Sequence, residues 1–408
     1  MNKIMGLSMI PAVFLLIVIT FFTLPTANAA TITVPTDFLT IQAAIDAATP
    51  DDSIKVLRGT YEEQIIITKN IILSGSEAKS TIIKAPDNLK TSQFLQGTSN
   101  VIELSNNAKV TMKGFTIQGK VNSSCGNLFG IAVVNGATIN LDTSSINGCT
   151  ARAVLVGFCG MCFPGGPQIG HATITRSNIQ GYREIGITSG GEGSTILVSG
   201  NKIVATDSPE TPGQTGIVFG LGVKGTVHHN EISNNICKHP ACGPDFFNQI
   251  QAIGILSLQS DPDSAIFNNK IKNNDVGIGV FSPDGCCKIN HNKLQDNRFF
   301  GIVFLDGQYT SSQDKISGGD VGVAAIALSV DTVATLDHDK ITETTTPTQE
   351  LECCGFNAEI VTIPALSNSF QTSQFQSFQV SDMDSDLLMK KFGILGTSTH
   401  SNSESNPF

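Results

Sequence analysis

The chain has 408 residues and a formal charge of −10, it lacks tryptophan, and only 15% of its residues are charged. Its 39 glycines and recurrent asparagines suit short strands and tight turns better than helices. We see no basic cluster of the kind that nucleic acids require, so no nucleic-acid partner is expected.

The N-terminus has the features of a secretory signal peptide over residues 1–29. Lys3 supplies a positive charge, Ile10 to Leu24 is apolar, and Ala27-Asn28-Ala29 offers a small-residue cleavage site. An uncleaved membrane anchor is the alternative, because the apolar stretch extends to about 20 residues. Residues 31–408 are expected to be secreted or at the cell surface, with no transmembrane segment after cleavage.

Ten cysteines agree with export, since an even number in an exported chain favours disulfides. Cys237 and Cys242 flank four residues and are expected to pair, and Cys159 and Cys162 are candidates for another bridge. Two pairs of adjacent cysteines are expected to bridge to neighbouring loops, with a vicinal bridge or a Cu(I)-thiolate site as alternatives: Cys286-Cys287 and Cys353-Cys354.

Two short motifs alternate along the chain and indicate a structural repeat. One is Asn or Asp, a spacer, and Ile or Leu; the other is glycine before a β-branched residue. Ile271, Leu294 and Ile316 follow one another at 23 and 22 residues, the length of three short strands with their turns. The clearest copies of the first motif are 201–203, 230–232, 269–271, 292–294, 314–316 and 339–341, and the second begins at Gly130, Gly186, Gly216, Gly254, Gly277, Gly301 and Gly322.

This repeat predicts an all-β fold, a single-stranded right-handed parallel β-helix of about eleven coils between Ser53 and Val380. At ~4.8 Å per coil the rod would be ~50 Å long. The β-helix domain is expected over residues 31–380. Residues 381–408 are expected to form a C-terminal cap segment and a flexible tail.

An amphipathic cap helix is predicted at residues 38–48, because open sheet ends invite aggregation and four apolar residues there share a helical face: Ile41, Ala44, Ile45 and Ala48.

The Asn/Asp position of the first motif has two equally favoured interpretations, an inter-coil ladder of amides or simple surface turn residues. Longer coils contain insertions, which should emerge from one corner of the rod because the coils stack in register. These insertions are expected at 118–129, 204–215, 233–253 and 342–358.

Residues 31–83 resemble the opening of extracellular proteins of the pectate-lyase and pectin-esterase superfamily. The resemblance rests on TITVPTDFLTIQAAIDAATPDDSIKVLRGTYEEQIIITKNIILSGS, where Ile41 to Ile45 looks like the cap helix and Gly59 to Glu63 like the turn into the first coil. Residues 130–341 resemble the repeat of the same superfamily, which also occurs in surface proteins and in copper-site accessory proteins. The resemblance implies a pectate-lyase-like fold and leaves the activity open.

The catalytic motifs of that superfamily are not found, so no catalytic residue is assigned. Asp261 and Asp263 with nearby Asp275 are candidate Ca²⁺ ligands, although a simple Asp-Pro-Asp turn is the favoured interpretation. Four further aspartates fall in different turns and no pair can be placed on one face: Asp306, Asp314, Asp331 and Asp339.

Histidines and cysteines offer a second candidate metal site. His228 and His229 with His239 or Cys237 are possible ligands for a borderline metal, and Cys286-Cys287 for copper. Single histidines recur in the turns of alternate coils, about 9.6 Å apart, too far to share one metal ion: His229, His291 and His338. No cofactor is the favoured expectation, with Ca²⁺ or copper as alternatives.

Three functions remain open. The favoured hypothesis is an extracellular module whose long polar face binds carbohydrate or a cell-surface partner without catalysis. The second is a lyase, hydrolase or epimerase acting on uronate-containing polysaccharides, and the third is a copper-handling accessory protein.

Overall fold

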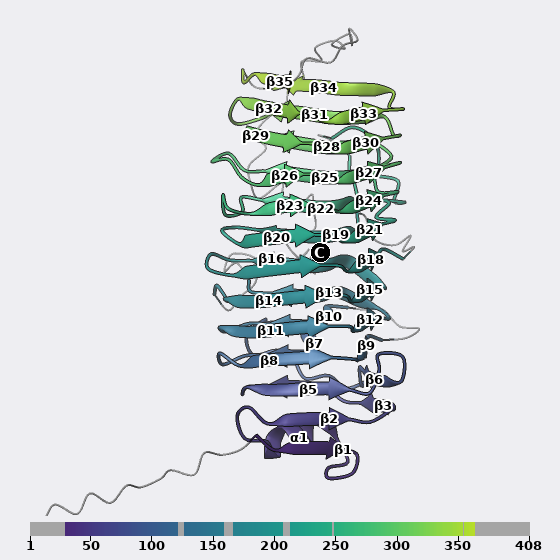
Figure 1. Cartoon of the computed structure of the whole chain (residues 1–408), viewed down its shortest axis with the longest axis vertical. Coiled ribbons are helices and arrows are strands. Elements are labelled where there is room, and N and C mark those ends of the chain that lie inside the picture. The colour runs from purple at the N-terminus through teal and green to yellow at the C-terminus, as the bar shows by residue number, and fades with distance from the viewer. Residues whose placement is uncertain are drawn as a thin grey trace, which may run out of the picture.

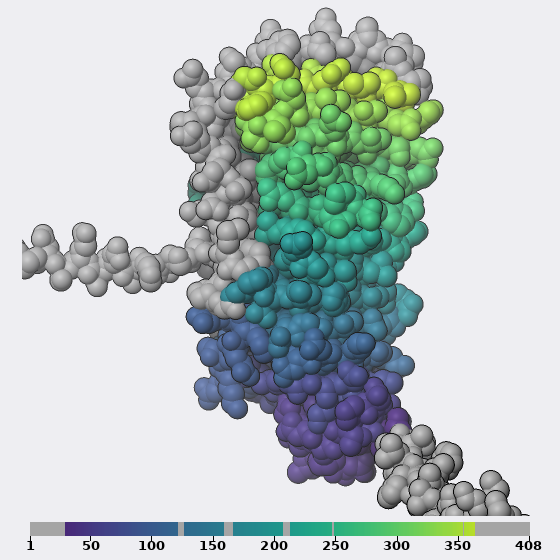
Figure 2. All heavy atoms as spheres, turned by 90° about the vertical axis from the view of Figure 1, so that its left-hand side faces the viewer, coloured from purple at the N-terminus to yellow at the C-terminus, as the bar shows by residue number. Residues whose placement is uncertain are grey.

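The computed structural model describes residues 29–120, 126–158, 166–206, 213–246, 249–353 and 355–363. These residues form one rod, in which the chain advances steadily from one end to the other (Figures 1 and 2). Three sheets of parallel strands, which we name A, B and C, run along the rod. The expected parallel β-helix is confirmed.

Sheet A has thirteen strands. They are β1 (Thr31–Val34), β2 (Ser53–Val56), β5 (Ile71–Gly75), β8 (Lys109–Lys113), β11 (Ala137–Asp142), β14 (Gly170–Thr175), β17 (Thr195–Ser199), β20 (Lys224–His228), β23 (Ala265–Phe267), β26 (Lys288–Asn290), β29 (Gly307–Ser312), β32 (Thr332–Asp337) and β35 (Ala358–Ile363).

Sheet B has eleven strands. They are β3 (Gly59–Glu62), β6 (Thr81–Lys84), β9 (Thr116–Gln118), β12 (Ser145–Asn147), β15 (Asn178–Gln180), β18 (Lys202–Val204), β21 (Glu231–Ser233), β24 (Lys270–Lys272), β27 (Lys293–Gln295), β30 (Lys315–Ser317) and β33 (Lys340–Thr342).

Sheet C also has eleven strands. They are β4 (Ile65–Ile67), β7 (Ser99–Leu104), β10 (Leu128–Val133), β13 (Thr150–Val156), β16 (Tyr182–Gly190), β19 (Thr215–Gly220), β22 (Ile253–Leu258), β25 (Val276–Phe281), β28 (Phe300–Leu305), β31 (Val321–Ala327) and β34 (Thr346–Glu352).

Each coil takes one strand from sheets A, B and C in turn. Eleven coils run from β2 to β34, and β35 begins the next, which confirms the expected number. The expected insertions at 118–129, 204–215 and 233–253 lead from sheet B to sheet C and so share one corner. The fourth expectation was wrong, because residues 346–352 of the expected insertion at 342–358 form strand β34 of sheet C. The predicted domain end at 380 and the segment 381–408 lie outside the described residues.

The first end of the rod carries the predicted cap helix, α1 (Ile41–Ala47). The side chain of Thr40 accepts a hydrogen bond from the backbone N–H of Ala43 at 3.2 Å and so caps the helix N-terminus. Ile41 and Ile45 are buried, and the helix lies at the β1–β2 end of the sheets (Figure 1). No helix in the described part of the chain is long and apolar enough to cross a membrane.

The core of the rod is built from vertical stacks of apolar side chains. Ile271 of β24 pairs with Leu294 of β27, which pairs with Ile316 of β30, so residues in successive repeats become direct neighbours. All three are at most 1% exposed. Burying a side chain of this size contributes roughly 1.5–3 kcal/mol, so the repeated Ile or Leu is the main apolar contribution of each sheet B strand.

The repeated glycine has a steric explanation that the sequence motif alone did not supply. A Cβ added to Gly277 would lie 2.5 Å from the backbone oxygen of Gly301 in the next coil and 2.7 Å from Leu294 Cδ2. The same collision, at 2.4–2.6 Å, recurs at the other glycines of this column in sheet C. Glycine is therefore required where one coil approaches the next most closely.

We predict that Gly277→Ala destabilises the rod by about 1–3 kcal/mol, the usual cost of overpacking. Chemical denaturation measures the change. Gly279→Ala is the matched control in the same strand, since a Cβ there meets nothing closer than Leu256 Cδ1 at 3.3 Å. Equal stability of the two variants would contradict the steric role of Gly277.

The Asn/Asp column forms the inter-coil ladder. In the turns from sheet A to sheet B, the side-chain amide of Asn230 donates to Asn269 Oδ1 at 3.0 Å, and that of Asn269 donates to Asn292 Oδ1 at 3.0 Å. The backbone N–H of Asn230 donates to the same Asn269 oxygen at 3.0 Å. These side chains are buried, so each supplies hydrogen bonds that the turn's polar groups would otherwise lose.

Carboxylates replace the amides where the ladder continues toward β33. The backbone N–H of Asp314 donates to Asp339 Oδ1 at 2.7 Å, and Ser311 Oγ lies within 2.7 Å of a carboxylate oxygen of each aspartate. Burial, together with the charge of Asp339, raises the pKa of Asp314 to about 7. Burial also raises the pKa of Asp339. The structure therefore brings together two aspartates that sequence analysis left apart.

The raised pKa makes stability depend on pH. The folded chain holds a proton on Asp314 that the unfolded chain releases near pH 3.8, so stability falls as pH rises from about 4 to about 7. We predict that Asp314→Asn, which keeps an oxygen to accept from Asn292 and cannot ionise, stabilises the protein at pH 8 by up to about 4 kcal/mol. Urea denaturation at several pH values tests this.

The gain from Asp314→Asn should shrink toward pH 4, and Asp320→Asn at an exposed position should show no such trend. A variant that is less stable than the natural protein at pH 8 would overturn the assignment.

Candidate binding face

Sheet B lies along one side of the rod (right in Figure 1), and its outer face carries mostly polar side chains. From β9 onward its strands have three residues each, and the central residue points into the core. Because side chains alternate along a strand, the first and third residues of each strand point outward. From β9 onward each coil therefore directs two side chains to this face, of which Thr116 and Ser233 are themselves buried.

A groove of about 1040 Å³ follows this face across seven neighbouring strands, from β6 to β24. At ~4.8 Å between strands, six steps give a length of ~29 Å. Its lining is mostly amide, hydroxyl and charged side chains from the outward strand positions and the adjoining turns, including Gln118, Asn147, Asn178, Gln180, Lys202 and Ser233.

Glu231 of β21 is the only carboxylate among the groove-lining residues that the structure describes. It forms an ion pair with Lys272 of β24, with the nitrogen and oxygen 3.0 Å apart. The hydrogen bond from Lys272 lowers the pKa of Glu231, and the charges of Lys202 and Lys270 add to this effect. Glu231 is therefore stabilised in its ionised form by Lys272, so it is poorly suited to act as a general acid.

The outer face of sheet C differs from this groove. Ile302 and Phe304 of β28 point into the core, whereas Val303 and Leu305 point to the other side and belong to a second apolar cluster. Phe246, from the 234–252 connection, packs edge-on against Phe300 at 6.1 Å between ring centroids. Strands β10, β13, β19, β22, β25, β28 and β31 are buried along their whole length.

The structure does not bring the three candidate Ca²⁺ ligands together, because the chain takes them to different corners of the rod. Asp261 and Asp263 lie in the turn from sheet C to sheet A, where Asp263 pairs with Lys224 at 2.9 Å. Asp275 lies between sheets B and C and is fully buried. Between Asp263 and Asp275 the chain passes through β23 of sheet A and β24 of sheet B, which are two of the three sides of the coil.

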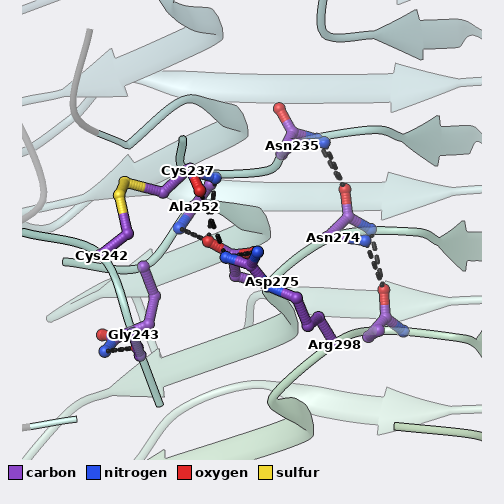
Figure 3. A network of polar contacts seen from close by, with 10 residues as sticks. Asn235, Cys237, Cys242, Gly243, Ala252, Asn274, Asp275 and Arg298 are labelled. Carbon is purple, nitrogen blue, oxygen red and sulfur yellow. Dashed lines mark hydrogen bonds and ion pairs between the residues drawn. A yellow bond between two sulfur atoms is a disulfide. The ribbon is translucent and has the colours of Figure 1, made fainter. Parts of the chain in front are cut away.

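Asp275 instead anchors the 234–252 insertion (Figure 3). Its Oδ2 accepts hydrogen bonds from the backbone N–H groups of Cys237 and Ala252, each at 3.0 Å. Its Oδ1 lies 2.8 Å from Arg298 Nη2 in an ion pair. Burial raises the pKa of Asp275 despite these partners. An amide ladder, Asn235–Asn274–Asn297, runs beside this network.

The histidine candidates are only partly brought together. His228 and His229 lie with their Nδ1 atoms 2.8 Å apart, and the His228 ring stacks on Phe267 at 4.8 Å. Burial and the neighbouring His229 lower the pKa of His228. His239 instead accepts a hydrogen bond from the backbone of Ala241 in the insertion. Within the described ranges, no three His, Cys, Asp or Glu side chains are grouped to hold a metal.

Two disulfides join pairs of cysteines that both lie within the described residues. Cys237 pairs with Cys242, as the short loop indicated. Cys286 pairs with Cys287, so the favoured expectation of bridges to neighbouring loops was wrong for this pair and the vicinal alternative holds. In this state the two sulfur atoms offer no thiolate to copper. Cys159 and Cys162 lie outside the described residues.

The spacer of the first motif marks an exposed column that the sequence predictions do not include. The spacer is the first outward residue of a sheet B strand, and it is lysine in five of the six clearest copies: Lys202, Lys270, Lys293, Lys315 and Lys340. The signal was present in the sequence, but its meaning depends on knowing that these positions are stacked and exposed.

Residues 165–333 match a family described as "Right handed beta helix region". No curated protein sequence matches the chain. Similar solved structures include alginate lyase from Paenibacillus sp. str. FPU-7, with 13% identity and a TM-score of 0.38 over 81% of this chain and 98% of that one.

A mannuronan C-5 epimerase A-module from Azotobacter vinelandii has 15% identity and a TM-score of 0.40, over 79% of this chain and 94% of its own. The Family 28 exopolygalacturonase of Yersinia enterocolitica has 14% identity and a TM-score of 0.39, over 82% and 78%. From the three parallel sheets and the match of residues 165–333, the chain is a right-handed parallel β-helix.

Proposed function

We propose that the protein binds an extended carbohydrate along the groove of sheet B and does not transform it. The observation that carries this proposal is the groove itself, which crosses seven strands and repeats its polar side chains at each coil. The inter-strand spacing of ~4.8 Å is close to the length of one sugar residue, so successive residues of a glycan would meet equivalent side chains.

The chemistry of the lining suits hydroxyl-rich ligands. Asn147, Asn178 and Gln180 have amide groups that donate and accept hydrogen bonds, as sugar hydroxyls do. The side chains of Asn178 and Gln180 are half-buried at the groove wall. Such a row gives weak contacts that add along a polymer, which suits long chains better than single sugars.

The positions of the carboxylates support binding without catalysis. Glycoside hydrolysis commonly uses two carboxyl groups on either side of the scissile bond, whereas the described groove lining offers only Glu231, which is paired with Lys272. Asp314 and Asp339, which lie in adjacent turns, are engaged in the inter-coil ladder. We propose that the protein binds its ligand outside the cytoplasm, because disulfides such as Cys237–Cys242 persist in oxidising compartments.

Replacing both Asn178 and Gln180 by alanine should weaken binding of a matching glycan by about tenfold, the loss of roughly two hydrogen bonds. Screening on a glycan array identifies the ligand, and calorimetry measures the affinity. Thr173→Ala is the control, because Thr173 belongs to the same coil but faces outward from sheet A. Equal affinity of all three proteins would remove the groove from the binding site.

Incubating the natural protein with the bound glycan should release neither new reducing ends nor unsaturated products. Release of either product, lost in a Glu231→Gln variant, would replace the binding function with an enzymatic one.

A further inference from the structure

The bridge between Cys286 and Cys287 lies in the turn that leads from β25 of sheet C to β26 of sheet A. The two cysteines are adjacent in the chain, so the bridge closes no loop of other residues. The stabilising effect of a disulfide grows with the length of the loop that it closes. Cross-linking of the fold therefore does not explain this pair.

Two serine hydroxyls contact the sulfur atoms from inside the rod. Ser260 Oγ lies 2.7 Å from Cys286 Sγ, and Ser257 Oγ lies 3.2 Å from Cys287 Sγ. The two hydroxyl oxygens are 2.6 Å apart. Within the described residues, the hydrogen-bond partners of these hydroxyls are each other and the two sulfur atoms.

The position of Ser257 is unusual for a hydroxyl. It is fully buried, and its neighbours in register are Phe219 in the preceding coil and Val280 in the following one. Burying a hydroxyl among apolar side chains costs free energy unless it is well hydrogen-bonded. A neutral sulfur is a weak acceptor, whereas hydrogen bonds to an ionised group are about twice as strong as neutral ones. The serine pair therefore suits a thiolate better than it suits the bridge.

The bridge is accessible from the outer side of sheet A, where a cavity of about 450 Å³ lies over β26 and β29. Both cysteines line this cavity, together with Pro262, Gln308 and Thr310. Cys286 is half-buried, and Cys287 is 6% exposed. Reactive cysteines are commonly partly exposed in this way. A small thiol therefore reaches the sulfur of Cys286 without unfolding of the rod.

We propose that Cys286 and Cys287 form a reversible redox site, which a dithiol reductant opens and a cyclic disulfide closes. One thiolate of the reductant attacks Cys286 Sγ, and the electron pair of the S–S bond leaves with Cys287 Sγ as a thiolate. The second thiolate of the reductant then attacks its own sulfur in the mixed disulfide. This step releases Cys286 and leaves the reductant as a cyclic disulfide, and the two protons of the dithiol pass to the two cysteines.

The serines are positioning residues for the first step. Both hydroxyl oxygens lie within 3.4 Å of Cys287 Sγ, so Ser257 and Ser260 both donate to the sulfur that leaves as a thiolate. Opening the bridge disconnects no strand, because it joins neighbouring residues of one turn. The site lies on sheet A and is independent of the proposed carbohydrate groove on sheet B.

The test titrates the folded protein with dithiothreitol and identifies the opened cysteines by alkylation and peptide mass mapping. Cys286 and Cys287 should be alkylated while the circular dichroism spectrum remains that of the folded rod. Oxidised dithiothreitol should close the bridge again. Alkylation of this pair only in denaturant would overturn the inference, and so would unfolding of the rod when the bridge opens.

Ser257→Ala and Ser260→Ala, made separately, should each slow the opening by about tenfold, since each removes one hydrogen bond to a charged sulfur. In the reduced variants the ultraviolet absorbance of the thiolate should appear at higher pH than in the reduced natural protein. Ser264→Ala is the matched control, because this fully buried hydroxyl accepts a hydrogen bond from the backbone of Gly225 at 3.0 Å.

Opening rates in the Ser257 and Ser260 variants equal to that of the Ser264 variant would contradict the role of the hydroxyls. If Ser257→Ala does not fold, Ser260→Ala decides the outcome, because Ser260 is 5% exposed and lies closer to the surface.

Discussion

Direct stacking of each coil on the next is the constraint on which the rest of this structure depends. Parallel pairing joins Ile232, Ile271, Leu294 and Ile316 without a shift in register, so a residue type repeated in sequence becomes a continuous column in space. The hydrophobic stabilisation of each coil comes from its neighbours, as in other solenoids. Any side chain that prevents close approach between coils therefore disturbs two interfaces at once.

The same constraint explains both glycines and buried polar residues. At Gly277 the backbone of the next coil occupies the place of a side chain. In the turns from sheet A to sheet B, Asn230 and Asn269 meet their own kind above and below, and an amide satisfies both neighbours because it donates and accepts. A carboxylate only accepts hydrogen bonds, so Asp314 and Asp339 continue the ladder as two neighbouring acidic groups. Burial and the charge of Asp339 raise the pKa of Asp314 to about 7.

On the outside of the rod, the repeated strand positions form long faces along the rod axis and not a single closed pocket. The three faces differ in what their outward positions carry: apolar side chains on sheet C, mixed polar ones on sheet A, and amides and lysines on sheet B. A ligand with a matching repeat meets the same contact many times, so affinity depends on its length and charge pattern more than on any one residue. For this reason the proposed binding site is the face of sheet B that carries Asn178 and Gln180.

Periodic features were determined by the sequence, because a constant spacing of apolar residues admits few folds. The column Ile271–Leu294–Ile316, the number of coils and the helix around Ile41 and Ile45 follow from such spacing. The Cys237–Cys242 pairing also follows from the sequence, because only four residues separate the two cysteines. One region failed even here, since residues 346–352 lack the glycine motif and were taken for an insertion, although they continue sheet C as β34.

Only the tertiary structure decided what each column faces. Asp261 and Asp275 are near in sequence but lie at different corners, whereas Asp314 and Asp339, 25 residues apart, meet in adjacent turns. The bridge between Cys286 and Cys287 and the burial of Asp275 beside Arg298 depend on which loops are within reach. Spacing along the chain specifies which residues are equivalent, but burial, charge compensation and bonding depend on neighbours that only the stacked coils bring together.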